Sequence, residues 1–87
     1  MKTIIKILDC GTYCEAEILN GVINVTRSGG CPVEEIIGKI NYSPRRKLQK
    51  IADEVLSAWV SGYDGDPHQN DLTVEIVRGE NSIEVAA

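Results

Sequence analysis

The dipeptide Asn20-Gly21 is the feature that most restricts how this chain can fold. Asparagine followed by glycine favours a two-residue type I′ turn, because both central positions of that turn need a positive φ. The segments on either side, residues 13–19 and 22–27, alternate apolar and polar side chains as half-buried strands do. We therefore expect a β-hairpin whose opposed pairs are Leu19 with Val22, Ile18 with Ile23, Ala16 with Val25, and Cys14 with Arg27.

A third strand is expected at residues 3–9, joined to the hairpin by a type II′ turn at Gly11-Thr12. This turn pairs Lys6 with Glu17, which opposite charges favour on an exposed face. Both turns then assign the same side chains to one inner face of a three-stranded meander: Ile5, Ile7, Cys14, Ala16, Ile18, Ile23 and Val25.

Two helices are expected after the glycine-rich break at residues 28–30. Pro32 suits the first position of a short helix with Cys31 at its cap, and Gly38 limits its length. Ser43 suits the N-cap of a second helix, which has Pro44 in its first turn and extends to about Ser61. The expected buried stripe of the second helix is Leu48, Ile51, Ala52, Val55 and Trp59.

The chain then predicts a second hairpin, with strands on either side of residues 79–81. The whole is an α+β fold, an antiparallel sheet of about five strands in the order β-β-β-α-α-β-β with two helices packed on one face. Eighty-seven residues suit one domain, so residues 1–87 are taken as a single domain.

Composition restricts the environment of the protein. The sequence has no apolar run near the roughly 18 residues that span a bilayer, so no membrane association is expected. Three cysteines at irregular spacing do not form a secreted disulfide framework. We therefore expect a cytoplasmic protein with reduced thiols.

Charge is distributed unevenly along the chain. Residues 36–52, here called the basic segment, hold five bases and no acid, whereas the rest holds four bases and thirteen acids. Cations at a helix start oppose the helix dipole, so either nearby acids neutralise them or they form a site for phosphate, nucleic acid or an acidic protein surface. The candidate contact residues are Arg45, Arg46, Lys47, Lys50 and Lys39.

A second candidate surface is acidic. Alternation along the expected strands places four glutamates together on the outer face of the sheet. This face is either solvated or engages a basic partner. The glutamates are Glu15, Glu17, Glu75 and Glu84.

The cysteines are the obvious candidates for chemistry. Cys10, Cys14 and Cys31 with the single histidine, His68, are a Cys₃His set of the kind that binds zinc. Strand parity opposes this site, because it puts Cys10 outside and Cys14 inside the same hairpin. With Cys31 at a helix cap, the three thiols are not expected to meet. Asp9 and Arg27 are expected to flank Cys14 at the open end of the inner face.

The segment "DGDPHQND" offers Asp64, Asp66, His68 and Asp71 to a divalent cation. It lacks the central glycine and final glutamate of an EF-hand loop, so it is read as a turn-rich connection. No nucleophile motif accompanies His68. No metal, no cofactor and no enzymatic activity are expected.

The succession of a strand, "TYCEAEI", a further strand, a glycine-rich break and "PVEEIIGKI" resembles the N-terminal part of HicB-type antitoxins. The resemblance covers about the first 40 residues and implies an antitoxin-like binding protein. The proline- and glycine-bearing segment between strands that is typical of that family is missing.

These observations favour a small non-catalytic protein that binds another protein as an inhibitor or modulator. Phage-encoded modulators of host nucleoprotein machinery are of this kind. One alternative is binding of nucleic acid or phosphate by the basic segment, and another is a thiol or zinc-binding protein. A homodimer formed through an exposed edge strand is a further expectation.

Overall fold

The structure, a computed structural model, describes residues 2–63 and 71–87. This part of the chain forms five strands and two helices in the predicted order. They are β1 (Thr3–Asp9), β2 (Thr12–Leu19), β3 (Val22–Arg27), α1 (Val33–Ile37), α2 (Leu48–Gly62), β4 (Leu72–Arg78) and β5 (Asn81–Ala86).

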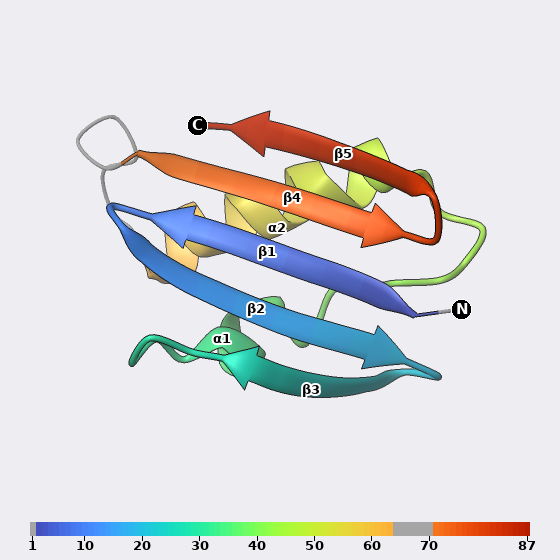
Figure 1. Ribbon diagram of the computed structural model, residues 1–87, viewed down its shortest axis with the longest axis horizontal. Helices are drawn as coiled ribbons and strands as arrows, with labels where there is room; N and C mark the ends of the chain where they lie inside the picture. The colour runs from blue at the N-terminus through green and yellow to red at the C-terminus, as the bar shows by residue number, and fades with distance from the viewer. Residues whose placement is uncertain (1, 64–70) are drawn as a thin grey trace.

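The five strands make one antiparallel sheet in the order β3-β2-β1-β4-β5, so β1 is the central strand. Both helices lie on one face of it, behind the sheet in Figure 1. α2 packs against β4 and β5, and α1 packs against α2 and β3. The fold is therefore α+β with two layers, as predicted. Neither helix of the described residues has the length and apolar character needed to cross a membrane.

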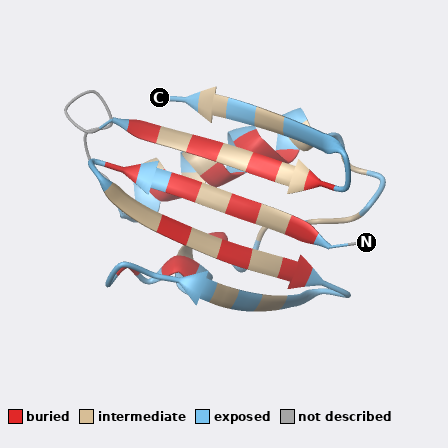
Figure 2. Ribbon diagram, viewed as in Figure 1, coloured by how far each residue is buried: buried red, intermediate tan, exposed pale blue. Residues whose placement is uncertain are grey.

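The core fills the space between the sheet and the helices. Alternate residues of β1, β2 and β4 are buried, which Figure 2 shows as red bands along these strands. α2 adds one helical stripe of side chains, as its spacing predicts. The buried apolar residues are Ile5, Ile7, Cys14, Ala16, Ile18, Cys31, Val33, Ile37, Ile51, Ala52, Val55, Trp59, Leu72, Val74 and Ile76.

The turn between β1 and β2 differs from the predicted turn. Cys10 and Gly11 occupy its central positions, with φ of 50° and 84°. Lys6 consequently lies opposite Glu15, and the predicted pair of Lys6 with Glu17 is wrong by two residues. A shift of two residues leaves every side chain on its predicted face, because side chains alternate with a period of two.

The pairing of β2 with β3 follows the predicted register at first and then slips by one residue at a β-bulge. Thr26 is the additional residue, and its Oγ1 donates a hydrogen bond to the main-chain oxygen of Glu15 at 3.1 Å. Beyond the bulge Arg27 lies opposite Glu15. The prediction that Arg27 lies opposite Cys14 is therefore wrong, because the extra residue reverses the face that Arg27 occupies.

The second helix begins later than predicted. α2 starts at Leu48 with Lys47 as its N-cap, and no side-chain hydrogen bond caps it. The Ser43-Pro44 signal instead forms a separate turn, in which the Arg46 amide donates to the main-chain oxygen of Ser43 at 3.0 Å. Arg45 and Arg46 consequently precede the helix and do not lie in its first turn.

Candidate functional site

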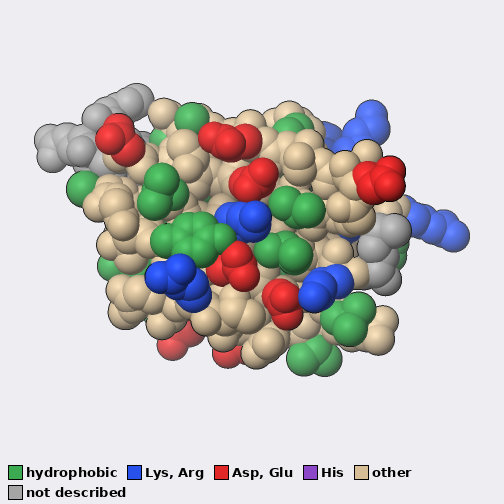
Figure 3. Space-filling view, viewed as in Figure 1, with side chains coloured by type: hydrophobic (Ala, Val, Ile, Leu, Met, Phe, Trp, Pro, Cys, Tyr) green, Lys and Arg blue, Asp and Glu red, His purple; other side chains and the backbone are tan. Residues whose placement is uncertain are grey.

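The open sheet face comprises the outward side chains of the five strands, on the side away from the helices. Figure 3 shows this face, where apolar side chains lie among charged ones. Strand register arranges the side chains in three rows across the sheet, a charged row between two rows of more apolar character. The charged row is Arg27, Glu15, Lys6, Glu75 and Glu84; the row toward the β1–β2 turn is Tyr13, Leu8, Thr73 and Ala86; the third row is Asn24, Glu17, Ile4, Val77 and Ser82.

Large apolar side chains are exposed on this face. Leu8 is 42% exposed, Leu19 48% and Val22 67%. Leu19 and Val22 lie directly opposite each other beside the β2–β3 turn. Tyr63, at the end of α2, is the fourth large apolar residue exposed within residues 2–63 and 71–87. Three of the four exposed side chains therefore share one surface.

The charged row carries an excess of negative charge. Lys6 Nζ lies 3.7 Å from Glu75 Oε1, but Glu75 also lies directly opposite Glu84 on β5. Like charges in that position destabilise a sheet. Glu84 takes part in none of the ion pairs of the described residues. Two cations, Lys6 and Arg27, thus face three glutamates in this row, and Arg27 lies opposite Glu15 at the far end from Glu84.

Hydrogen bonds hold Glu15 in its ionised form. The Tyr13 hydroxyl donates to Glu15 Oε1 at 2.5 Å and Thr26 Oγ1 donates to Oε2 at 3.1 Å. The Tyr13 bond is the main reason that the pKa of Glu15 lies below its usual range. Burial and the bond to Glu15 raise the pKa of Tyr13 to about 12. Arg27 lies over the Tyr13 ring, 5.3 Å from its centre, which keeps that ring in place on the face.

The basic segment is partly neutralised. Arg46 donates from Nη1 and Nη2 to both carboxylate oxygens of Glu54, at 2.7 and 2.8 Å. This pairing holds the pKa of the Glu54 carboxyl below its usual range. Lys39 and Arg46 line the same shallow hollow between α1 and α2, together with Glu54. Among the residues described, no ion pair includes Lys39, Arg45, Lys47 or Lys50.

Sequence reasoning missed one charged residue, Arg78. It is the last residue of β4, lies on the inner face of the sheet and is 7% exposed. Its Nε donates to Thr3 Oγ1 at 3.0 Å. Its Nη atoms donate at 3.2 to 3.4 Å to main-chain oxygens of the segment that leads into α2, those of Tyr42, Ser43, Pro44 and Arg46. Alternation along β4 was the available signal, because Arg78 follows Leu72, Val74 and Ile76 on the inner face.

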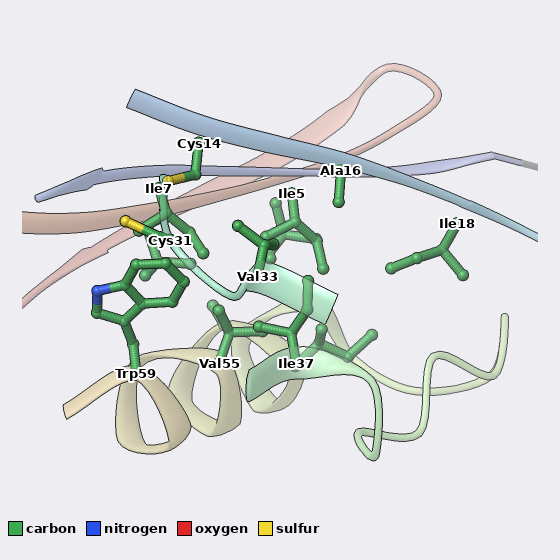
Figure 4. Close-up of a cluster of buried hydrophobic side chains, with 14 of the residues drawn as sticks. Ile5, Ile7, Cys14, Ala16, Ile18, Cys31, Val33, Ile37, Val55 and Trp59 are labelled. Carbon is green, nitrogen blue, oxygen red and sulfur yellow. The ribbon is translucent and has the colours of Figure 1, made fainter. Parts of the chain in front are cut away.

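The structure also corrects the expectation that the thiols stay apart. Cys10 is exposed and Cys14 is buried, as strand parity predicts. Cys31 is buried too, and Figure 4 shows its sulfur and that of Cys14 at the same end of the core cluster, beside the Trp59 ring. Asp9 lies at this end of the core, where its Oδ2 accepts a hydrogen bond from Trp59 Nε1 at 2.9 Å. The predicted flanking of Cys14 by Asp9 and Arg27 is thus wrong for Arg27, which lies on the open sheet face.

The structure describes only some of the residues that the sequence offers as metal ligands. Residues 2–63 and 71–87 contain no group of three or more His, Cys, Asp or Glu side chains placed to hold one metal ion. Asp64, Asp66 and His68 lie outside the described residues.

A hollow of about 450 Å³ lies between the β2–β3 turn and residues 38–44. No charged side chain lines it, and its one phenol, Tyr42, donates its hydroxyl to the main-chain oxygen of Ile37 at 2.7 Å. Burial raises the pKa of Tyr42, so this hydroxyl stays protonated and serves the fold.

The edge strands differ in their charge. Each carries one charged side chain, but Arg27 is the last residue of β3, beyond the bulge, whereas Glu84 lies within β5. Charged residues on an edge discourage pairing with another chain. The predicted homodimer, which stays a prediction, therefore has β3 as its more suitable edge.

No family model, no curated protein and no solved structure matches this chain.

Proposed function

We propose that this protein is a non-catalytic binding protein that engages another protein through the open sheet face. The observation that carries the proposal is the exposure of Leu8, Leu19 and Val22 on a sheet face that has no helix over it. An antiparallel sheet with one solvated face normally presents polar side chains there. Exposed apolar groups among charged ones are typical of surfaces that other proteins cover.

The charges on this face indicate the chemistry of the partner. Glu75 and Glu84 lie opposite each other at an energetic cost that a cation from a partner would relieve. Hydrogen bonds keep Glu15 ionised beside them. The same charges repel phosphate groups. The face therefore suits a protein surface that offers apolar side chains surrounded by lysine or arginine.

Substitution of the exposed leucines tests this proposal. The double variant Leu8→Ser with Leu19→Ser removes apolar contact area from the open sheet face without altering the core. We expect its affinity for the partner to fall at least about 30-fold, since each buried leucine contributes about 1 kcal/mol or more to binding. Affinity is measured by calorimetry with a partner that is captured from the source organism, identified by mass spectrometry and purified.

The matched control is a variant with Arg45, Lys47 and Lys50 changed to serine. The proposal predicts that this control keeps native affinity and that both variants keep the native circular dichroism spectrum. Loss of binding in the control with retention in the leucine variant would move the binding surface to the basic segment.

A second candidate function is phosphate or nucleic-acid binding by the basic segment. It is supported by Arg45, Lys47 and Lys50, which none of the described ion pairs includes, and by the absence of acids from the first turn of α2. If this function holds, the affinity for a DNA or RNA duplex falls steeply as salt rises, with a logarithmic slope of roughly −2 to −3 for the phosphates that three cations neutralise. Titration by fluorescence anisotropy from low to moderate salt measures the slope, and absence of binding at low salt rejects this candidate.

A further inference from the structure

We infer that Cys14 and Cys31 form a dithiol that a low-molecular-weight disulfide such as oxidised glutathione closes reversibly, cross-linking β2 to the turn before α1. This inference is independent of the open sheet face. It concerns a modification site on the opposite side of the sheet.

The two cysteines are held by one shared acceptor, the main-chain oxygen of Ser28. The Cys14 thiol donates to this oxygen at 3.2 Å and the Cys31 amide donates to it at 2.8 Å. Cys14 is fixed near the start of β2, and Cys31 follows a turn that contains Gly29 and Gly30. Figure 4 shows both sulfurs at the same end of the core cluster, near the Trp59 ring. A rigid strand and a glycine-rich turn therefore present one thiol each to the same small volume.

The surroundings of the pair favour exchange that begins at Cys31. Cys31 is 7% exposed and Cys14 is 0% exposed, and the residues from Ser28 to Gly30 are exposed. An incoming disulfide thus reaches the sulfur of Cys31 first when the turn opens locally. Burial raises the pKa of Cys14 to about 12, and the neighbouring Cys31 thiol and the Asp9 carboxylate act in the same direction. In the part of the chain that the structure describes, Tyr63 is the other titratable group that faces the pair. Cys14 consequently reacts second and slowly at neutral pH.

Closure of the disulfide needs no reactant other than oxidised glutathione. The Cys31 thiolate attacks one sulfur of oxidised glutathione, which forms a mixed disulfide and releases one glutathione thiolate. Cys14 loses its proton to water and attacks the Cys31 sulfur, which releases the second glutathione. Two protein thiols are oxidised to one disulfide, and one oxidised glutathione is reduced to two glutathione thiols.

The test uses the full chain carrying Cys10→Ser, which removes the exposed thiol and leaves the pair. The variant is incubated with oxidised glutathione, remaining thiols are alkylated, and intact mass and peptide mapping are recorded. We expect a product lighter by two hydrogen atoms, with no retained glutathione and a Cys14–Cys31 peptide. The closing step should accelerate about tenfold for each pH unit from 7 to 9, as the thiolate fraction of Cys14 rises. The thermal midpoint should rise by at least about 5 °C and return to its starting value with dithiothreitol.

The control adds Cys14→Ala to Cys10→Ser, and circular dichroism checks that it is folded. We expect this protein to retain one glutathione on Cys31, because the second thiol is missing. The inference is overturned if the Cys10→Ser chain keeps two alkylatable thiols, or if it stops at a glutathione adduct at pH 9. It is overturned equally if the cross-link lowers the thermal midpoint, since that result would show that the two thiols meet only after distortion of the backbone.

Discussion

Replacement of Trp59 by alanine is expected to lower the free energy of unfolding by about 4 kcal/mol. The indole is fully buried on α2 at the end of the core, and its ring lies 5.3 Å from that of Tyr63. Alanine would leave a cavity there and would also remove the hydrogen-bond donor of Asp9. A domain of this size has a total stability of about 5–10 kcal/mol, so much of it would be lost. Urea unfolding followed by circular dichroism measures the change.

The variant Trp59→Phe separates packing from hydrogen bonding. Phenylalanine keeps most of the apolar volume but leaves Asp9 Oδ2 without its donor, which is expected to cost about 1–3 kcal/mol. A double-mutant cycle with Asp9→Asn then gives the coupling of the two side chains. A loss below about 1 kcal/mol for Trp59→Ala would contradict the burial of the indole.

Replacement of Arg78 by methionine is expected to destabilise the protein by about 3 kcal/mol. Methionine has a similar length but no donors, so it would leave Thr3 Oγ1 and four main-chain oxygens without this partner. These oxygens belong to the segment that leads into α2. The loss should therefore appear in urea unfolding and also as faster hydrogen exchange of the Arg46 amide, which closes the turn at Ser43.

Arg78→Lys is the matched control for charge. Lysine keeps the positive charge, but its single ammonium cannot span acceptors that the five donors of a guanidinium reach together. We expect it to recover less than half of the loss. Native stability in Arg78→Met would show that water satisfies the same oxygens, and full recovery with lysine would show that charge alone matters.

The sequence predicts which face of the sheet each strand side chain occupies, but it does not predict which residues lie opposite each other. Turn signals and alternation placed the inner side chains correctly, because a strand has only two faces and its apolar side chains must lie on the one that faces the core. They did not separate a turn at Gly11-Thr12 from one at Cys10-Gly11, since the two differ by two residues and keep the same faces. The bulge at Thr26 had no sequence signal, and it moved Arg27 to the open face.

Long-range contacts explain the remaining errors. Ser43 and Pro44 carried a strong helix-start signal, but Arg78 from β4 binds the main chain of this segment, and α2 begins at Leu48. Likewise, strand parity separated Cys14 from Cys10 but gave no information on Cys31, which reaches Cys14 through a turn. Tertiary partners far along the chain determined both outcomes.

The charged residues of the open sheet face were predictable from the sequence, but its exposed apolar residues were not. Alternation placed the four glutamates on one face, as the structure has them. Leu8, Leu19 and Val22 follow the same alternation, which does not distinguish them from other residues of the strands. Their significance depended on the fact that both helices cover the other face, which only the fold reveals.

The central place of β1 has a consequence for the order in which the molecule assembles during synthesis. Thr3 pairs with Ile18 on one side and with Arg78 on the other. The first pairing is available as soon as β2 has left the ribosome, whereas the second must wait for β4. Until then one edge of β1, with its row of isoleucines, has no neighbouring strand and can pair with another nascent chain. The rate at which residues 72–78 join the sheet therefore sets how long each new molecule is at risk of aggregation.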